Sequence, residues 1–231
     1  MSRICVLIPV YNREDTIERA INSLKEQTNK NFDVYICNDG CTDKTMEIIN
    51  KTLGNNPGFK VTIKNLENNM GQNKARNITL KMAKDSGIKY DYVAGLDADD
   101  KFMPNHIEDN IKYLDEHQDI DIIYSDCSVG DGTPKWDWVC REFNAPFLKA
   151  LNYIPHYAVY KAKYLEIPYD ENIKRLTDWD RWLNLLLNHN AKFAHLCKVT
   201  YHIFRDKNSV SNNNTENLDE AVKKVKGKYK I

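Results

Sequence analysis

The chain of 231 residues lacks several features that would place it in a large class of proteins. No apolar run approaches the roughly 20 residues that span a bilayer, so we expect at most peripheral membrane contact. Lysine and arginine together number 33, as do aspartate and glutamate. This zero net charge argues against a protein that binds nucleic acid through a general basic field.

Cysteine pairs with the spacing C-x-x-C are also missing, which argues against a zinc site. Several of the six cysteines fall in predicted strands, where cysteine behaves as a small apolar residue. Reduced thiols are typical of the cytoplasm, which is the compartment we expect. The absence of G-x-G-x-x-G argues against an NAD-dependent dehydrogenase.

Up to residue 125, apolar strand patterns alternate with amphipathic helix patterns. This alternation predicts an α/β fold with a mostly parallel sheet flanked by helices. The first apolar run leads straight into a polar turn without a cleavage site, so it predicts a strand and not a signal peptide. Strands are expected at 4–10, 32–37, 59–63, 90–96 and 120–124, and helices at 14–27, 44–53, 73–84 and 104–117.

After residue 125 the alternation becomes irregular. Residues 217–228 fit either an amphipathic helix or a frayed end, and both interpretations stay open. We expect a turn-rich stretch at 130–141, a short helix at 143–152, a strand at 156–164, a helix at 177–187 and a strand pair at 192–204.

The sequence Asp97-Ala98-Asp99-Asp100 places three carboxylates at the end of an apolar run. Open α/β sheets bind ligands at the carboxyl ends of their strands. Two acids one residue apart can converge on a hard cation that bridges substrate phosphates. A polar turn that leaves the strand explains the same residues, because the Asp-x-Asp spacing also occurs at 119–121 and 178–180.

Other junctions between strands and helices carry polar residues as well. Turn and capping chemistry explains each of them singly; Asn12, for example, fits a helix N-cap. Four polar junctions in order favour a shared ligand site, because the carboxyl ends of parallel strands gather on one rim. The side chains expected in this cleft are Tyr11, Asp39, Lys74, Arg76, Asp97 and Asp99.

These motifs together resemble glycosyltransferase family 2, whose members have the GT-A fold. The resemblance covers roughly residues 3 to 211. It implies a metal-dependent, inverting enzyme that moves a sugar from a nucleotide-sugar, usually a UDP-sugar, to an acceptor hydroxyl in glycan or polysaccharide synthesis. It rests on residues 6–12, 38–43, Gly71 with 75–77, 96–100 and, more loosely, 177–182.

The resemblance also implies roles for individual residues. Asp99 would bind Mn²⁺ or Mg²⁺, and this cation would offset the charge that builds on the departing diphosphate. A carboxylate such as Asp39 accepts hydrogen bonds from a base N–H or a ribose hydroxyl. The nucleotide-binding residues would be Pro9, Tyr11, Asn12, Asp39, Lys74, Arg76, Asp97 and Ala98.

By the same resemblance, Asp178 is the general base that removes the proton of the acceptor hydroxyl. The family usually has Glu-Asp at this point, whereas this chain has Thr177-Asp178, which leaves the type of acceptor open. A structural alternative is a capping box in which Thr177 caps the helix and Asp180 reaches back. The two are compatible, because Asp178 is the member that the box does not use.

The remaining candidates have both a functional and a structural interpretation. His202 stands where related chains often carry arginine, and His202 or Arg205 would contact the metal or the diphosphate. A single histidine in a strand is more often structural, and His156 is a weaker case of the same kind. The tryptophans Trp136, Trp138 and Trp179 would line an acceptor pocket or belong to the core.

We therefore expect a nucleotide-sugar-binding half at 1–125, an acceptor-binding half of the same domain at 126–205, and a polar tail at 206–231. The partners would be a nucleotide-sugar donor and a sugar, glycan or lipid-linked acceptor. Because the second half is short, we expect a partner or a second subunit to complete it, the latter in a homo-oligomer. Two alternatives remain: an inactive nucleotide- or glycan-binding module on the same fold, and a sugar nucleotidyltransferase, for which the first junction lacks a glycine-rich loop.

Overall fold

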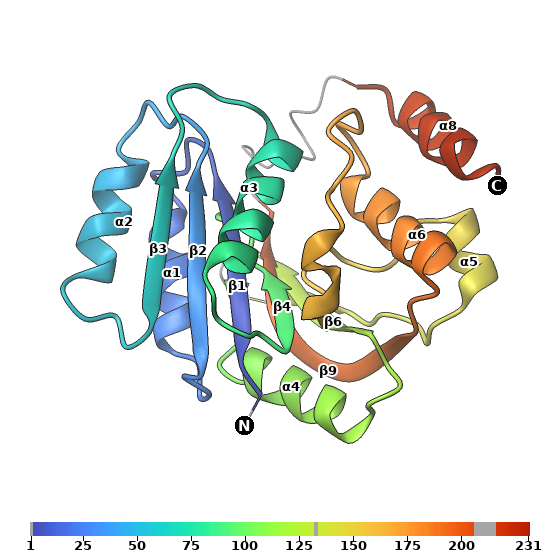
Figure 1. Cartoon of the computed structure of the whole chain (residues 1–231), viewed down its shortest axis with the longest axis horizontal. Helices are drawn as coiled ribbons and strands as arrows, with labels where there is room; N and C mark the ends of the chain where they lie inside the picture. The colour runs from blue at the N-terminus through green and yellow to red at the C-terminus, as the bar shows by residue number, and fades with distance from the viewer. Residues whose placement is uncertain (1, 132–133, 206–215) are drawn as a thin grey trace.

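A computed structural model describes residues 2–131, 134–205 and 216–231 (Figure 1). In its N-terminal half, strands and helices alternate as the apolar periodicity predicts. The elements are β1 (Ile4–Val10), α1 (Ile17–Lys25), β2 (Phe32–Asn38), α2 (Thr45–Leu53), β3 (Lys60–Asn65), α3 (Gln72–Asp85) and β4 (Tyr92–Gly95).

The second part of the chain mixes short strands with helices. Its elements are β5 (Lys101–Phe102), α4 (His106–Glu116), β6 (Ile122–Gly130), β7 (Pro134–Trp138), α5 (Ala145–Ala150), β8 (Val159–Lys161), the 3₁₀ helix η1 (Ala162–Glu166), α6 (Thr177–His189), β9 (Phe193–Phe204) and α8 (Leu218–Tyr229).

Across the described residues, nine strands form one sheet in the order β3-β2-β1-β4-β8-β6-β9-β5, with β7 beside β6. The strands β3, β2, β1 and β4 are parallel to one another, and β9 is parallel to β6. The strands β8, β7 and β5 are antiparallel to their neighbours. The expected α/β architecture with a largely parallel sheet and flanking helices is confirmed.

Each face of the sheet is covered by helices that bury an apolar layer. The side chains of β1 alternate between the two layers, because successive residues of a strand point to opposite faces. Ile4, Val6 and Ile8 pack with α1, α2 and α4, whereas Cys5 and Leu7 pack with α3 and α6. Figure 1 shows α3 on the near face of the sheet and α1 on the far face.

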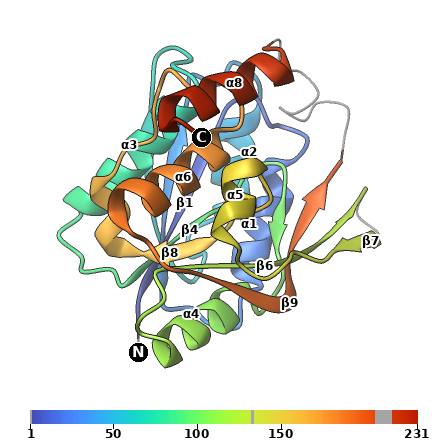
Figure 2. The same ribbon diagram turned by 90° about the vertical axis from the view of Figure 1, so that its right-hand side faces the viewer.

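After residue 125, the structure corrects two predictions and settles a third that the sequence left open. The stretch 130–141 is not only turns, because β7 pairs with β6 inside it. The stretch 192–204 forms one long strand, β9, and not a strand pair. Residues 218–229 form a helix, α8, whose Ala221 and Val225 are buried (Figure 2). Within the described ranges, none of the helices combines the length and apolar character needed to cross a membrane.

Candidate functional site

A cavity of about 520 Å³ lies at the carboxyl ends of β1, β2 and β4, where the sequence predicts a cleft. Its opposite wall comes from β7, α6, the end of β9 and the segment 152–157 that leads to β8. The predicted site residues that line it are Pro9, Tyr11, Asp39, Asp97, Ala98, Asp99, Trp138, Asp178 and Arg205.

The acid residues after β4 form a tight turn that neighbouring elements hold from outside. Asp100 N donates to Asp97 O at 3.1 Å and closes the turn. From α1, Arg19 Nε donates to Asp99 O at 3.0 Å. From β9, the hydroxyl of Tyr201 donates to Asp100 Oδ2 at 3.2 Å. Because these contacts fix the backbone of the turn, the directions of its carboxylates are fixed as well.

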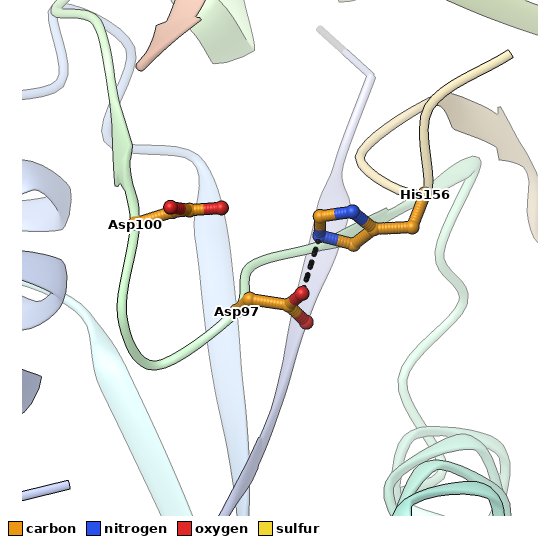
Figure 3. A group of neighbouring side chains, drawn as sticks. All are labelled: Asp97, Asp100 and His156. Atoms are coloured by element: carbon orange, nitrogen blue, oxygen red, sulfur yellow. Dashed lines mark ion pairs between the residues drawn. The ribbon is translucent and has the colours of Figure 1, made fainter. Parts of the chain in front are cut away.

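Asp97, Asp100 and His156 lie close enough to hold a metal ion, with one ligand atom from each within 4.8 Å of the others. Figure 3 shows Asp97 and Asp100 on one turn and His156 on the facing segment, with the three side chains pointing toward a common space. His156 Nε2 lies 3.1 Å from Asp97 Oδ2, yet this buried atom has no hydrogen-bond partner. Two carboxylates and an imidazole therefore form a donor set that could hold a divalent cation.

The electrostatics of the turn also favour a cation. Burial raises the pKa of Asp97, but the charges of His156 and Arg76 outweigh burial and lower it overall. Burial and the Asp97 charge raise the pKa of Asp99, and burial together with both neighbouring carboxylates raises that of Asp100 well above its usual value. Three carboxylates on one turn repel one another, so a divalent cation would allow all of them to ionise.

The structure places Asp99, the predicted metal ligand, and Asp97, a predicted nucleotide-binding residue, differently from the prediction. Asp99 lies outside the three-residue group, and its Oδ2 faces Arg13 Nε at 3.4 Å. Asp97, which the resemblance assigned to the nucleotide, belongs to the group. Arg13 itself lines the cavity and brings a positive charge beside the acid turn.

Asp39 connects the second junction to the loop before α3. Its Oδ1 accepts from Met70 N at 2.7 Å and its Oδ2 from Gly71 N at 3.0 Å. The following Gly40 has φ +74° and lies directly against the Asn68 backbone. An ionised carboxylate has about four acceptor positions, so Asp39 keeps lone pairs that can face the cavity.

Three other predicted nucleotide residues do not line the cavity. Asn12, at φ 47°, accepts from Thr42 N at 2.9 Å and shapes the turn. Lys74 lies on the surface, 3.3 Å from Glu171. The buried guanidinium of Arg76 connects the two halves, with 3.4 Å to Asp97 Oδ1 and 2.8 Å to Thr177 Oγ1.

Asp178 is in the first turn of α6 and lines the cavity wall opposite Asp39. Asn152 Nδ2 donates to its Oδ2 at 3.1 Å, and Trp179 N approaches its Oδ1 at 2.9 Å. The predicted capping box is wrong. Leu176, in a left-handed conformation, is the N-cap, and Asp180 turns away to Lys228 of α8 at 2.7 Å.

The remaining candidates are divided between the cavity and the core. Trp138 lines the cavity, whereas Trp136 is half exposed beside it, 5.8 Å from the guanidinium carbon of Arg205. Trp179 is buried and its indole donates to a carbonyl. His202 is buried at 2.6 Å from a serine hydroxyl, and burial lowers its pKa. The Ser-x-Ser loop at 209–211 lies outside the described residues.

Sequence reasoning gave little or no weight to four residues that line this cavity. His156 carried only its residue type as a signal, and Asp100 was visible as the third acid of its motif. Arg13 and Asn152 carried no signal. Both Asn152 and His156 belong to an irregular segment, where no strand or helix period indicates which side chain faces inward.

Residues 5–170 match the sequence profile of the family described as "Glycosyl transferase family 2". The chain is 30% identical over 230 residues to a chondroitin synthase of Pasteurella multocida (strain Pm70), covering 95% of this chain and 22% of that protein. It is also 30% identical over 207 residues to a hyaluronan synthase of Pasteurella multocida, covering 86% and 20%.

Among solved structures, S. aureus TarS 1-349 in complex with UDP-GlcNAc superposes with a TM-score of 0.71 at 21% identity, covering 96% of this chain and 64% of that one. This likeness confirms the fold. The chain spans about a fifth of the length of the two synthases.

Proposed function

Since this chain belongs to glycosyl transferase family 2, we propose that it transfers a sugar from a nucleotide-sugar to an acceptor hydroxyl with inversion at the anomeric carbon. One observation carries the proposal. A single cavity is lined on one side by Asp39 and the acid turn, and on the other by Asp178. A donor held by the first wall would present its sugar to an acceptor held at the second.

The donor is a UDP-sugar, held with its nucleotide against Tyr11 and Asp39 and its diphosphate at the acid turn. Residues 1–125 supply this half of the site except for His156, which reaches in from the second half. Asp97, Asp100 and His156 would hold Mn²⁺ or Mg²⁺, with Asp99 close by. When bound, the cation supplies Lewis-acid stabilisation of the departing diphosphate. Support for UDP comes from the fold likeness to a protein solved with UDP-GlcNAc.

Asp178 takes the proton of the acceptor hydroxyl, whose oxygen forms the new bond to the anomeric carbon. The bond from that carbon to the diphosphate oxygen breaks, and the electron pair leaves with the diphosphate. Attack comes from the face opposite the leaving group, which inverts the configuration. A carboxylate in the first turn of a helix is stabilised by the helix dipole, and this is the position of Asp178.

The acceptor is a sugar of a glycan or polysaccharide, bound by residues 126–205. Trp138 in the cavity and Trp136 beside it offer aromatic faces at i and i+2 of β7, which places them on one side of the strand. Similarity to the two Pasteurella synthases supports a polysaccharide acceptor.

Thermal unfolding with UDP, with and without Mn²⁺, tests the donor site. A ligand at 100 times its dissociation constant adds about 2.7 kcal/mol. We expect a Mn²⁺-dependent stabilisation by UDP that Asp97→Asn and Asp100→Asn abolish. If Asp99→Asn keeps this stabilisation, the metal ligands are those of the three-residue group; if Asp99→Asn abolishes it, Asp99 is a ligand as well.

Release of UDP from a panel of UDP-sugars with oligosaccharide acceptors tests the transfer step. Asp178→Asn should keep the stabilisation by UDP and lose transfer. If the native chain binds UDP but transfers no sugar, the chain is a binding module and the proposed activity is wrong.

A further inference from the structure

Asn152 is the one side chain whose amide contacts the candidate base within the described part of the chain. Its Nδ2 donates to Asp178 Oδ2 at 3.1 Å, and both residues line the cavity. On the basis of the proposed function, we infer that Asn152 is a positioning residue, which fixes the orientation of Asp178 for proton abstraction.

The carbonyl oxygen of the Asn152 amide indicates that this residue is not explained by stability. Its Oδ1 is buried and has no hydrogen-bond partner. A buried carbonyl oxygen that loses water without gaining a donor destabilises the folded state. Rotating the amide would not help, because Oδ1 would then face the carboxylate of Asp178. The fold therefore keeps an unsatisfied polar oxygen beside the candidate base, which calls for an explanation other than stability.

The backbone around Asn152 is attached to the same helix that carries Asp178. The indole of Trp179 donates to Leu148 O at 2.6 Å, and the indole of Trp182 donates to Ile154 O at 3.1 Å. These two bonds hold the chain on either side of Asn152. The segment and α6 are thus fixed to each other, so the distance between the amide and the carboxylate is preserved.

Each carboxylate oxygen of Asp178 accepts one hydrogen bond. Trp179 N approaches Oδ1 from the backbone of the helix, and Asn152 holds Oδ2 from the facing segment. This pair sets the plane of the carboxylate and directs its remaining lone pairs. Donation to the charged form of a carboxyl also favours ionisation. Loss of Asn152 should therefore slow proton removal without weakening donor binding.

Asn152→Leu is the test variant, because leucine has a similar volume and cannot donate a hydrogen bond. The matched control is Asn144→Ala. Asn144 lies in the same region but caps α5 by accepting from Phe147 N at 2.8 Å. For transfer from the active UDP-sugar, we expect Asn152→Leu to lower kcat about tenfold or more and to leave the donor KM within about twofold.

The pH profile separates positioning from a structural role. The acid limb of kcat/KM should move to higher pH by about one unit in Asn152→Leu and stay in place in Asn144→Ala. Asn152→Leu should unfold at or above the native temperature, whereas Asn144→Ala should unfold below it. A native kcat with a native acid limb in Asn152→Leu overturns the inference, as does a loss of kcat that only follows loss of folded protein.

A second measurement needs no activity. Asp178 in a chain labelled with ¹³C at aspartate Cγ is assigned by its loss in Asp178→Asn and titrated by NMR. Its titration midpoint should rise in Asn152→Leu; an unchanged midpoint overturns the inference. If the native chain transfers no sugar, the proposed function fails while this titration still tests the contact.

Discussion

Acidification should destabilise the fold through His106, the first residue of α4. The ring is 1% exposed and stacks on Phe102 with the ring centroids 3.9 Å apart. Its Nδ1 lies 2.8 Å from Thr200 Oγ1, and its Nε2 is buried without a hydrogen-bond partner. Burial lowers the pKa of His106 from its usual 6.5 to about 3.

The sign and size of the effect follow from proton linkage. The unfolded chain binds a proton at His106 near pH 6.5, whereas the folded chain does so only near pH 3. The folded state is therefore unaffected above pH 6.5 and loses stability as the pH falls toward 3. Each pH unit in this window costs about 1.4 kcal/mol, so the loss at pH 5 is about 2 kcal/mol.

Urea unfolding at pH 7.5 and pH 5 measures this loss. The native chain should lose about 2 kcal/mol more than His106→Gln, which cannot take up the proton. The difference removes the contributions of carboxylates, which both proteins share. His117→Gln, at the exposed end of the same helix, should keep the native dependence. An equal loss of stability in the native chain and in His106→Gln would refute the reasoning.

Two further predictions concern the backbone near Asp39 and the docking of α8. Gly40→Ala should cost about 3 kcal/mol and weaken UDP binding, because a Cβ would lie 2.6 Å from Asn68 C at a φ of +74°. Gly87→Ala, at φ +72° in open space, should cost only about 1 kcal/mol in the same urea titration. Lys228→Met removes the cation that lies 2.7 Å from the buried Asp180, so amide exchange in α8 should accelerate. Unchanged exchange would show that the contact between Lys228 and Asp180 does not hold this helix.

The parts of the fold that the sequence predicted are those that depend on the periodicity of a single strand or helix. The alternation of β1 side chains between the two apolar layers and the amphipathic faces of α1 to α4 follow from strand and helix periods, and strands and helices form near the expected positions. The gathering of Tyr11, Asp39 and the acid turn on one rim also needs only the rule that carboxyl ends of parallel strands meet.

The capping-box prediction failed for a reason that the local sequence does not contain. The motif Thr177 to Asp180 has the right residue types, but α8, far along the chain, supplies Lys228 as a partner for Asp180. Arg76 likewise donates a hydrogen bond to the hydroxyl of Thr177. Tertiary contacts replaced the local hydrogen bonds because they satisfy the buried groups better than the short-range alternative does.

The sequence by itself determined the main alternation of strands and helices up to residue 125, the family, and the strand ends that line the cleft, because each depends on a period or a motif a few residues long. Only the tertiary structure decided that His156 joins Asp97 and Asp100, and that Asn152 holds Asp178 across 26 positions of sequence. Both residues come from an irregular segment, whose path is set by the burial of Trp179 and Trp182 against it and not by a repeat of its own.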